Sequence, residues 1–523
     1  MELVLSIDCG TQSLRTILFD KKGEIRASAK VSFVPYYSRK PGYAEQDPSV
    51  YYDALCKACA MLKRNYQDLF DRIAGVVVTT QRDTIIIVDE NGNPLRPAIL
   101  WIDQRTASFK LRDYFSITEI SAYRLVGMDK ISEQVMQKSK AYWIKEHEPE
   151  LWKKTHKFLL LSGYLNYSLT GEMKDSIGNM IGHLPFSAKT FGYPTNLKNI
   201  AYRQFGVEER MLAKLIPVGE ILGHITKKCS QDMGLSEGIK VIAGASDKGA
   251  ETLATGCLDE TTASLSFGTT ATVQITTDKY IEPLKFIPPY PAAIKGKYNP
   301  EYEVFRGYWL ISWFKKEFAH HEILEAEKRN ISPEEVLNES LREIPCGSEG
   351  LMLQPYWTPG IKMKDARGSI IGFSDVHTRV HIYRAIIEGI NYGLLEGIEK
   401  IEHCTKKKIT KAFVSGGGSQ SKEICQITAD ILGIPVCRIQ THEASGLGAA
   451  IIGYVGIGCY ASIQEAVSNM VRYADRFEPD KINAALYKRL YNEGYKKIFA
   501  ALNPVYSQIN KILNGGTNDE QTI

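Results

Sequence analysis

Two aspartates of this chain each follow a strand-like segment, and three turns are built around glycine. Asp8 comes after the apolar run Leu3–Ile7, and Asp247 ends the segment 240–247. Carboxylates at strand ends are suited to holding hydrated Mg²⁺ or to removing a proton. The glycine turns are centred on Gly10, Gly268 and residues 416–418. Because glycine lets backbone N–H groups approach a phosphate closely, this set of residues predicts a two-lobed phosphotransfer site.

The Gly-Thr turn occurs twice, each time between two strand-like segments. The two copies span residues 3–20 and 262–278, one at the head of each half of the chain. This repetition predicts a duplicated nucleotide clamp, in which Thr and Ser hydroxyls add donors to phosphate. The copies differ, because Asp8 precedes the first turn and Phe267 takes the equivalent place before the second. We therefore expect the first hairpin to serve metal and phosphate together, and the second phosphate only.

The triple glycine 416–418 follows a strand-like run from Lys411 and precedes a predicted helix. It would let a purine and a ribose lie against bare backbone. Taken alone, these glycines fit a helix C-cap or crowded packing. Taken alone, Asp247 fits a helix N-cap better than a general base. The combination of three glycine turns with two isolated aspartates is what favours binding of ATP.

A polar triplet, Gln81-Arg82-Asp83, lies between the apolar segments 73–79 and 84–88. Folds of the α/β class usually bind ligands at such strand ends. A guanidinium beside a carboxylate can donate to and accept from adjacent hydroxyls, as a polyol requires. A structural ion pair is the alternative interpretation. Trp101 could add an apolar wall against sugar C–H groups, although a tryptophan at a strand end is more often part of a core.

The composition is that of a large globular protein without a nucleic-acid or membrane partner. With 523 residues, the chain exceeds the size of a single core, and 44% of it is hydrophobic, so two domains are expected. Lys and Arg total 64 against 60 acidic residues, with no basic tract. No apolar run approaches the length of a membrane span. Ten scattered cysteines agree with a reducing compartment, and we expect a cytoplasmic protein.

Two further patterns are expected to be structural. Cys56 and Cys59 form one C-x-x-C within a helical pattern, which favours a helix face over a zinc or redox site. A group of aromatic residues also falls at helical intervals, which favours packing over a stack against a ligand. This group consists of Trp309, Trp313, Phe314 and Phe318.

The expected elements alternate between strand and helix, and this order predicts an α/β fold. A strand is predicted over 24–33, and a helix begins at Pro48 with Asp47 as its cap. Helices are also predicted over 106–114, 132–148, 157–169 (stopping at Gly171) and 378–403. A domain boundary near residue 248 divides the chain into 1–248 and 249–523. The polar, Gly-rich tail 514–523 is predicted to be disordered.

These residues resemble a known family, the FGGY carbohydrate kinases, which includes glycerol kinase and xylulokinase. The resemblance spans the whole chain, and its motifs occur in the order that the family has. Its carriers are residues 7–13 with Arg15, 80–84, 100–105, 244–247, 267–269, 368–372, 381–388, 415–421 and 429–433.

The resemblance implies two actin-like (ribonuclease H-like) domains with ATP, Mg²⁺ and a sugar in the cleft between them. It implies that Asp247 is the general base that takes a proton from a substrate hydroxyl. Asp8 would hold Mg²⁺ through water, with Asp247 close to the same metal. Gln81, Arg82, Asp83, Trp101 and Asp247 would bind the substrate.

The resemblance also distributes the ATP contacts over three turns. Residues of the first hairpin would face the β- and γ-phosphates, and residues of the second would bind from the other lobe. The triple-glycine segment would hold the adenosine. The residues are Gly10, Thr11, Gln12, Ser13 and Arg15, then Gly268 and Thr269, and finally Gly417, Gly418 and Lys422.

Departures from the glycerol kinase pattern predict a wider substrate pocket. Val135 and Thr272 stand where that enzyme has a tyrosine and a phenylalanine. We therefore expect a sugar, sugar alcohol or sugar acid larger than glycerol, phosphorylated at a primary hydroxyl by a homodimer. Three alternatives stay open at this point: glycerol kinase proper, an actin-like ATPase that binds a protein partner, and a catalytically inactive sugar sensor.

Overall fold

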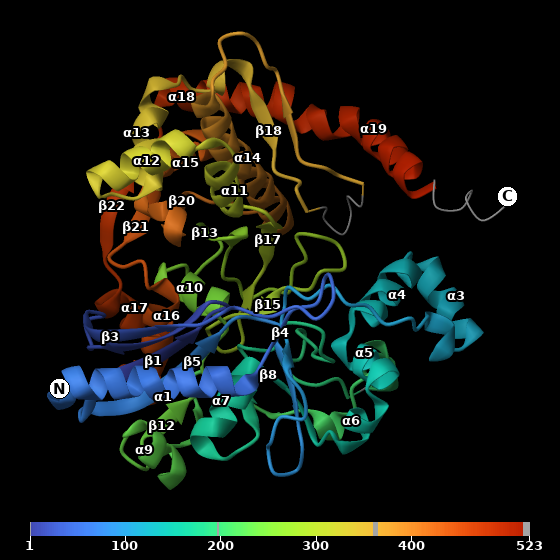
Figure 1. Cartoon of the computed structure of the whole chain (residues 1–523), viewed down its shortest axis with the longest axis vertical. Coiled ribbons are helices and arrows are strands. Elements are labelled where there is room, and N and C mark those ends of the chain that lie inside the picture. The colour runs from blue at the N-terminus through green and yellow to red at the C-terminus, as the bar shows by residue number, and fades with distance from the viewer. Residues whose placement is uncertain (1, 196–197, 359–364, 516–523) are drawn as a thin grey trace.

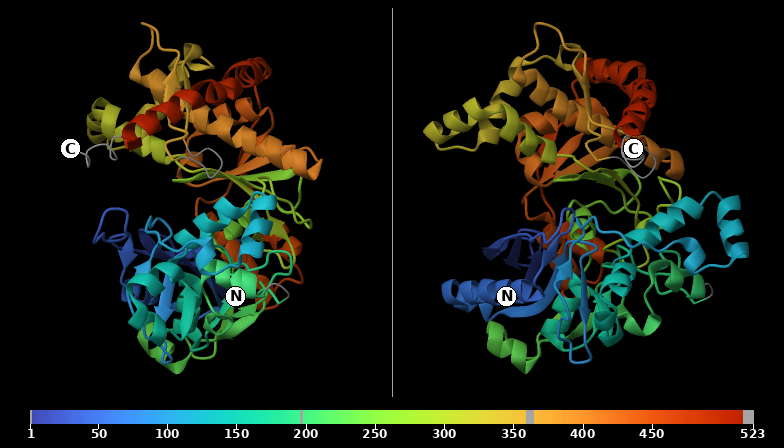
Figure 2. Two further views of the ribbon diagram at one scale, coloured as in Figure 1. Left: turned by 90° about the vertical axis from the view of Figure 1, so that its right-hand side faces the viewer. Right: turned by 45° about the vertical axis from the view of Figure 1, so that its right-hand side comes forward.

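The protein has two lobes, each built around a six-stranded sheet, in a computed structural model that describes residues 2–195, 198–358 and 365–515. Figure 1 shows the lobes one above the other, and Figure 2 shows the same division from two further sides. Most of the tail predicted to be disordered lies outside the described residues. Within them, no helix has both the length and the apolar character needed to cross a bilayer.

The sheet of the first lobe runs in the order β11-β12-β5-β1-β2-β3. From β3 to β11 the successive pairings are antiparallel, antiparallel, parallel, parallel and antiparallel. Its strands are β1 (Leu3–Cys9), β2 (Ser13–Phe19), β3 (Ile25–Ser32), β5 (Ile73–Thr80), β11 (Ile221–His224) and β12 (Lys240–Ile242).

The sheet of the second lobe has the order β17-β14-β13-β20-β21-β22 and the same succession of pairings. The predicted α/β fold with two actin-like domains is thereby confirmed, and the two Gly-Thr hairpins occupy corresponding places. The strands are β13 (Thr262–Phe267), β14 (Ala271–Gln274), β17 (Glu301–Val304), β20 (Lys411–Ser415), β21 (Val436–Ile439) and β22 (Tyr473–Phe477).

The register of the hairpins corrects one predicted equivalence. Counted back from the turn glycine, Ser266 and not Phe267 stands in the place of Asp8. Both residues also pair with the neighbouring parallel strand, Asp8 with Thr79 and Ser266 with Ser415. Phe267 is buried and stacks on Tyr308, with 4.5 Å between ring centroids. Successive side chains of a strand point to opposite faces, so Phe267 lies on the other face of β13 from Ser266.

Helices cover the two sheets as the apolar spacing requires. In the first lobe, α1 (Pro48–Asn65) packs on the sheet, and Asp47 caps it by accepting from the Ser49 N–H, as predicted. Cys59 is buried on the inner face of this helix, which confirms the structural interpretation of the C-x-x-C. In the second lobe, α14 (Arg379–Thr405) and α15 (Lys422–Leu432) cover the sheet.

One helix of the second half belongs to the core of the first lobe. The helix α16 (Ala444–Gly456) packs beside α10 (Asp247–Ala254) against β1, β2 and β5. Gly448 allows this approach, since a Cβ there would lie 1.9 Å from the carbonyl oxygen of Ala250. Figure 1 shows α16 beside the first sheet. The chain therefore returns to the first lobe after building most of the second.

Three predicted helices differ from those observed. Residues 157–169 form strand β8 (Lys157–Leu160) and then helix α7 (Leu161–Thr170), which ends at Gly171 in the left-handed conformation. An apolar run as short as that of β8 fits either structure, and here it pairs with β6 (Ile85–Val88). Residues 106–114 are helical only in a 3₁₀ turn at Leu111–Asp113.

The predicted helix 132–148 is two helices. They are α4 (Asp129–Lys138) and α5 (Lys140–His147), and they separate at Ser139, whose backbone is extended. The Ser139 hydroxyl donates to the carbonyl of Phe205 at 2.6 Å, which holds the break in place. Around them lie α3 (Ile117–Leu125), α6 (Pro149–Lys154) and the short strands β4 (Glu45–Gln46) and β7 (Ala98–Ile99).

Candidate active site

The turn of the first hairpin presents Asp8 beside a single cation. Asp8 and Arg15 are paired residues of β1 and β2, and Arg15 Nη1 lies 3.6 Å from Asp8 Oδ2. The same nitrogen lies 3.3 Å from Oε2 of Glu443, the residue before α16. The turn is closed by the Gly10 N–H, which donates to the carbonyl of Ser13 at 3.0 Å. The position of Arg15 thus depends on residues from both halves of the sequence.

The charge of Asp8 is only partly compensated, because Asp8 shares Arg15 with Glu443. Burial raises the pKa of Asp8 to about 7; Arg15 opposes that rise, whereas the carboxylates of Asp247, Glu443 and Glu251 add to it. A divalent cation at this point would relieve the repulsion between these groups. The donor set consists of hard carboxylate oxygens, which suits Mg²⁺.

Mg²⁺ typically binds through one or two carboxylates and the phosphates of its substrate. Among the residues that the structure describes, no group of three or more His, Cys, Asp or Glu is arranged to hold a metal ion. Asp8 and Asp247 would fit a site in which two carboxylates and the phosphates of the substrate bind Mg²⁺.

Asp247 is the first residue of α10 and is not its cap. The hydroxyl of Ser246 fills the cap position and accepts from the Gly249 N–H, so the N-cap interpretation of Asp247 is wrong. Asp247 Oδ1 accepts from the Lys248 N–H at 2.8 Å. Burial raises the pKa of Asp247, against the opposing effect of Arg82 and Lys248. The carboxylate is therefore more basic than an exposed aspartate.

A hydrogen-bonded chain connects α10 to the second hairpin. Lys248 Nζ lies 2.8 Å from Glu251 Oε2 and also donates to the hydroxyl of Ser266. From the neighbouring strand, Ser415 donates to Glu251 Oε1 at 2.5 Å. Lys248, the residue next to Asp247, is thus anchored to strand β13 of the second hairpin. Sequence reasoning missed Lys248 and Glu251, although both lie within four residues of Asp247.

Three of the predicted site residues form one hydrogen-bonded chain. Trp101 Nε1 donates to Thr11 Oγ1 at 3.1 Å, and Thr11 Oγ1 donates to Gln81 Oε1 at 2.6 Å. The Trp101 side chain is among the exposed large hydrophobic groups, with 42% of its surface accessible, so its assignment to a core is wrong. Thr11, which is predicted to bind phosphate, thereby contacts Trp101 and Gln81, which are predicted to bind substrate.

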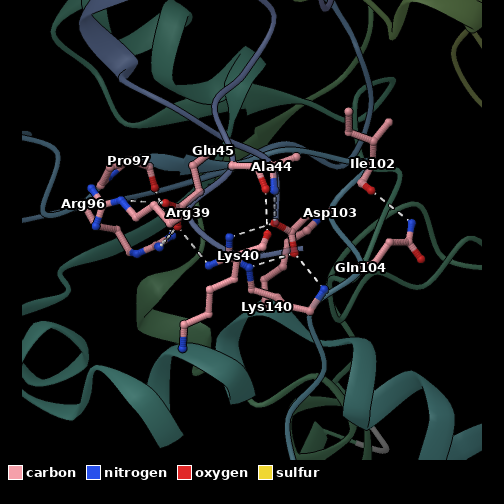
Figure 3. A network of polar contacts seen from close by, with 12 residues as sticks. Arg39, Lys40, Ala44, Glu45, Arg96, Pro97, Ile102, Asp103, Gln104 and Lys140 are labelled. Carbon is pink, nitrogen blue, oxygen red and sulfur yellow. Dashed lines mark hydrogen bonds and ion pairs between the residues drawn. The ribbon is translucent and has the colours of Figure 1, made fainter. Parts of the chain in front are cut away.

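A buried network fixes the loop that carries Trp101. Arg105 lies 2.7 Å from Asp103 and 3.0 Å from Glu45, and all three side chains are buried. Asp103 also accepts from the Ala44 N–H at 2.6 Å, and Glu45 forms a second ion pair with Arg96. Figure 3 shows Glu45, Asp103 and Arg96 within this network. Its two strands, β4 and β7, hold Trp101 close to the first hairpin.

Arg82 and Asp83 have separate partners. Arg82 lies 2.9 Å from Glu301 and 3.3 Å from Glu303, both on β17 of the second lobe, and its guanidinium lies over the Tyr290 ring. Burial raises the pKa of Glu301, although Arg82 opposes this, whereas the pKa of Glu303 is lowered by its bonds to Glu301 and Arg82 despite burial. Arg82 therefore joins the two lobes.

Asp83 is turned away from Arg82. It lies in the left-handed backbone conformation (φ 51°), 2.8 Å from Lys140 and 2.9 Å from His183 Nδ1. Despite burial, Lys140 and His183 hold the pKa of Asp83 well below its usual range. Lys140, His183, Glu301 and Glu303 were missed from the sequence, because between 57 and 221 residues separate them from the triplet.

The two positions that distinguished this pocket from that of glycerol kinase lie in different places. Thr272 is buried on β14 and is paired with Glu303, so it lies beside the partner of Arg82. Val135 is on α4.

A cavity of about 1180 Å³ lies against the second hairpin and the triple-glycine segment. Gly416 has a left-handed backbone (φ 85°), and Gly417 has open space where a Cβ would lie. A Cβ on Gly418 would lie 2.5 Å from the Tyr308 ring. The predicted ATP-binding residues that line this cavity are Gln12, Gly268, Thr269, Gly417, Gly418 and Lys422.

The remaining ATP residues, Gly10, Thr11, Ser13 and Arg15, lie in the first hairpin, outside that lining. The cavity wall also contains Trp309, on α11 (Trp309–Phe318). Trp309 packs against the core as predicted, but its edge position leaves it available to a ligand as well. Helical spacing in the sequence could not distinguish a tryptophan that only packs in the core from one that also lines a ligand cavity.

Comparisons with known proteins agree with this architecture. The model of the N-terminal domain of the FGGY family of carbohydrate kinases matches residues 3–254. The model of the C-terminal domain of the same family matches residues 263–457. The two matches together cover most of the chain.

Curated relatives match over nearly the full length. The xylulose kinase of Lactococcus lactis is 28% identical over 97% of this chain and 99% of its own length. The gluconokinase of Bacillus subtilis is 26% identical over 93% of this chain and 94% of its own. The crystal structure of xylulose kinase from Rhodospirillum rubrum is similar in fold, with a TM-score of 0.81, 24% identity, and coverage of 97% and 100%.

Proposed function

This chain belongs to the FGGY family of carbohydrate kinases, and on that premise we propose that it transfers the γ-phosphoryl group of ATP to a primary hydroxyl of a sugar or polyol larger than glycerol. One observation carries the proposal. The carboxylate of Asp247, on α10, adds to the raised pKa of Asp8, on β1, and Arg82 opposes the raised pKa of Asp247. Lys248, next to Asp247, donates to Ser266 of the second hairpin. These couplings support a site in which metal, base and acceptor residues act on one phosphoryl group.

Asp247 is proposed as the general base. In-line transfer makes the acceptor hydroxyl more acidic as its bond to phosphorus forms, so a moderately basic carboxylate in the right place suffices. The raised pKa of Asp247, caused by burial, increases that basicity. Its backbone carbonyl accepts from Ser445 at 3.2 Å, which connects the start of α10 to α16.

Asp8 is proposed to hold Mg²⁺ through water, with Asp247 close to the same ion. When bound, Mg²⁺ would neutralise charge on the β- and γ-phosphate oxygens of ATP. Arg15 contributes a cation on the same side and is kept there by Asp8 and Glu443. Gly10, Thr11, Gln12 and Ser13 would supply N–H and hydroxyl donors to the phosphates.

The second lobe is proposed to hold the rest of ATP. Gly268 and Thr269 would bind phosphate from the side opposite the first hairpin, and Gly417, Gly418 and Lys422 would lie against the adenosine. These five residues line the same cavity, whose volume is sufficient for a nucleotide. We retain residue 248 as the proposed domain boundary, a few residues from where the N-terminal family match ends.

The acceptor is proposed to lie against Gln81, Arg82, Asp83 and Trp101. Relatives named for xylulose and gluconate support an acceptor larger than glycerol. We also propose a cytoplasmic homodimer, as the family resemblance implies, and light scattering of the purified protein tests the dimer.

A coupled assay of ADP release with a panel of polyols, ketoses, sugar acids and glycerol tests the proposed function. We expect ADP release to require one of the acceptors larger than glycerol. Preference for glycerol over every larger acceptor would overturn the proposed substrate size. ATP turnover that no acceptor stimulates would instead favour an ATPase that binds a protein partner.

A further inference from the structure

Four cations at or near the proposed acceptor and phosphate residues, Arg82, Lys140, Lys248 and Arg15, are each paired with a carboxylate. Arg82 is held by Glu301 and Glu303. Relatives of this chain are named for two kinds of acceptor, a neutral ketose and a sugar acid, and the pairing of Arg82 should affect the binding of these two kinds differently. A sugar acid carries a permanent negative charge, which a binding site normally meets with a free cation.

We infer that the acceptor is an uncharged polyol or sugar, and that Glu303 excludes sugar acids by occupying Arg82. The inference rests on the proposed function, because it names the acceptor of the same site. Glu303 is the residue to consider, since its side chain is 23% exposed, whereas that of Glu301 is 2% exposed. Glu301 is also tied inward, where it accepts from Gln274.

The other cations offer no alternative anchor for an acid group. Lys140 is buried and lies 2.8 Å from the Asp83 carboxylate, and it also donates to the Asp83 carbonyl. Lys248 is paired with Glu251 at 2.8 Å. These two lysines are therefore compensated within the protein.

Arg15 is compensated in the same way, since it lies between Asp8 and Glu443. Asp247 adds one more carboxylate, which has no partner of its own at ion-pair distance among the described residues. A carboxylate on the acceptor would be repelled by Glu303 and Asp247 and would have to displace Glu303 from Arg82.

An uncharged polyol can bind beside Arg82, Glu303 and Asp247 without charge repulsion and without displacing Glu303 from Arg82. Its hydroxyls can donate to the carboxylates of Glu303 and Asp247 and can accept from Arg82. The Tyr290 ring, 5.0 Å from the Arg82 guanidinium, supplies an apolar surface that holds Arg82 in position. The structure thus favours neutral acceptors both by attraction and by repulsion of the acid.

Steady-state phosphorylation of xylulose, a pentitol and gluconate by the full-length enzyme tests this inference. We expect the kcat/KM of the best neutral acceptor to exceed that of gluconate by about 100-fold or more, as a few kcal/mol of like-charge repulsion requires. In Glu303→Gln, the ratio should fall by about 10-fold, mainly because the KM for gluconate decreases. Glu150→Gln, which removes an exposed carboxylate on α6, should leave the ratio unchanged.

Other outcomes would overturn the inference. Gluconate preferred by the wild-type enzyme would show that Glu303 yields Arg82 to an acid, while the kinase assignment would stand. A ratio unchanged in Glu303→Gln, with both acceptors losing kcat alike, would show that Glu303 has a purely structural role. If no acceptor of either kind is phosphorylated, the proposed function itself fails, and the inference fails with it.

Discussion

The two Gly-Thr hairpins share strand order and turn glycine but differ at one chemically decisive position. In the first hairpin this position holds Asp8, whose neighbours are Arg15 and several carboxylates. In the second it holds Ser266, a neutral hydroxyl that accepts from Lys248. The two hairpins therefore share the turn that we propose to bind phosphate, whereas the carboxylate that we propose to bind metal is present in only one of them.

Side-chain contacts also connect each lobe to the other. Ser266 belongs to the second lobe, yet Lys248 ties it to the helix that begins with Asp247. Arg82 of the first lobe reaches Glu301 and Glu303 of the second. Residues of the second lobe thus help to position Lys248 and Arg82, which lie beside the proposed catalytic groups of the first lobe.

The largest expected effect comes from Asp247→Asn, which keeps the shape of the side chain and removes the base. We expect kcat to fall by about 1000-fold, within the range for loss of a general base, with little change in the Kd for ADP. Calorimetric titration of ADP checks the binding, and the coupled assay checks the rate. A variant that retains most of its kcat would break the assignment of the base to the first lobe.

Alanine at the two turn glycines should have similar effects in the two hairpins. The nearest atom to an added Cβ lies 3.7 Å away at Gly10 and 3.5 Å away at Gly268, so both methyl groups fit the folded chain. Each would obstruct phosphate approach, and we expect the KM for ATP to rise by about 10-fold in Gly10→Ala and in Gly268→Ala. An effect confined to one variant would contradict the proposal that both turns bind phosphate.

Much of this arrangement could be predicted from the sequence. Asp8 and the glycine turns lie at or just after the ends of strands, and Asp247 begins the helix that follows β12. The apolar character of these strands is locally encoded, so the sequence pattern predicted these elements. The contacts of Arg82 and Asp83 could not be predicted in this way, because Glu301 lies 219 residues from Arg82 and Lys140 lies 57 from Asp83. The strand β8 was missed because its four residues have no period of their own.

The smallest expected effect concerns stability without Mg²⁺. The pKa of Asp8 is about 7 in the folded chain against an ordinary 3.8, so between these values the folded chain holds a proton that the unfolded chain has lost. Its contribution to stability therefore decreases as pH rises through this window. In EDTA at pH 8, we expect Asp8→Asn to raise Tm by about 2 °C or more, and this gain should shrink at pH 5.

Ser266→Ala is the matched control for that melting experiment, because no charge is removed at the corresponding position of the second hairpin. Its Tm relative to the wild type should not vary with pH across the same range. An Asp8→Asn variant that melts below the wild type at pH 8 would show that Asp8 is not destabilised by burial.

We propose that the first hairpin binds the metal and the second does not, and a titration of Mg²⁺ against initial rate distinguishes the two hairpins. With ATP and the best acceptor held constant, wild type, Asp8→Asn and Ser266→Ala are compared. We expect Asp8→Asn to need about 10-fold more Mg²⁺ for half-maximal rate, while Ser266→Ala stays within about 2-fold of the wild type. Equal shifts in the two variants, or an unchanged Mg²⁺ requirement in Asp8→Asn, would contradict this proposal.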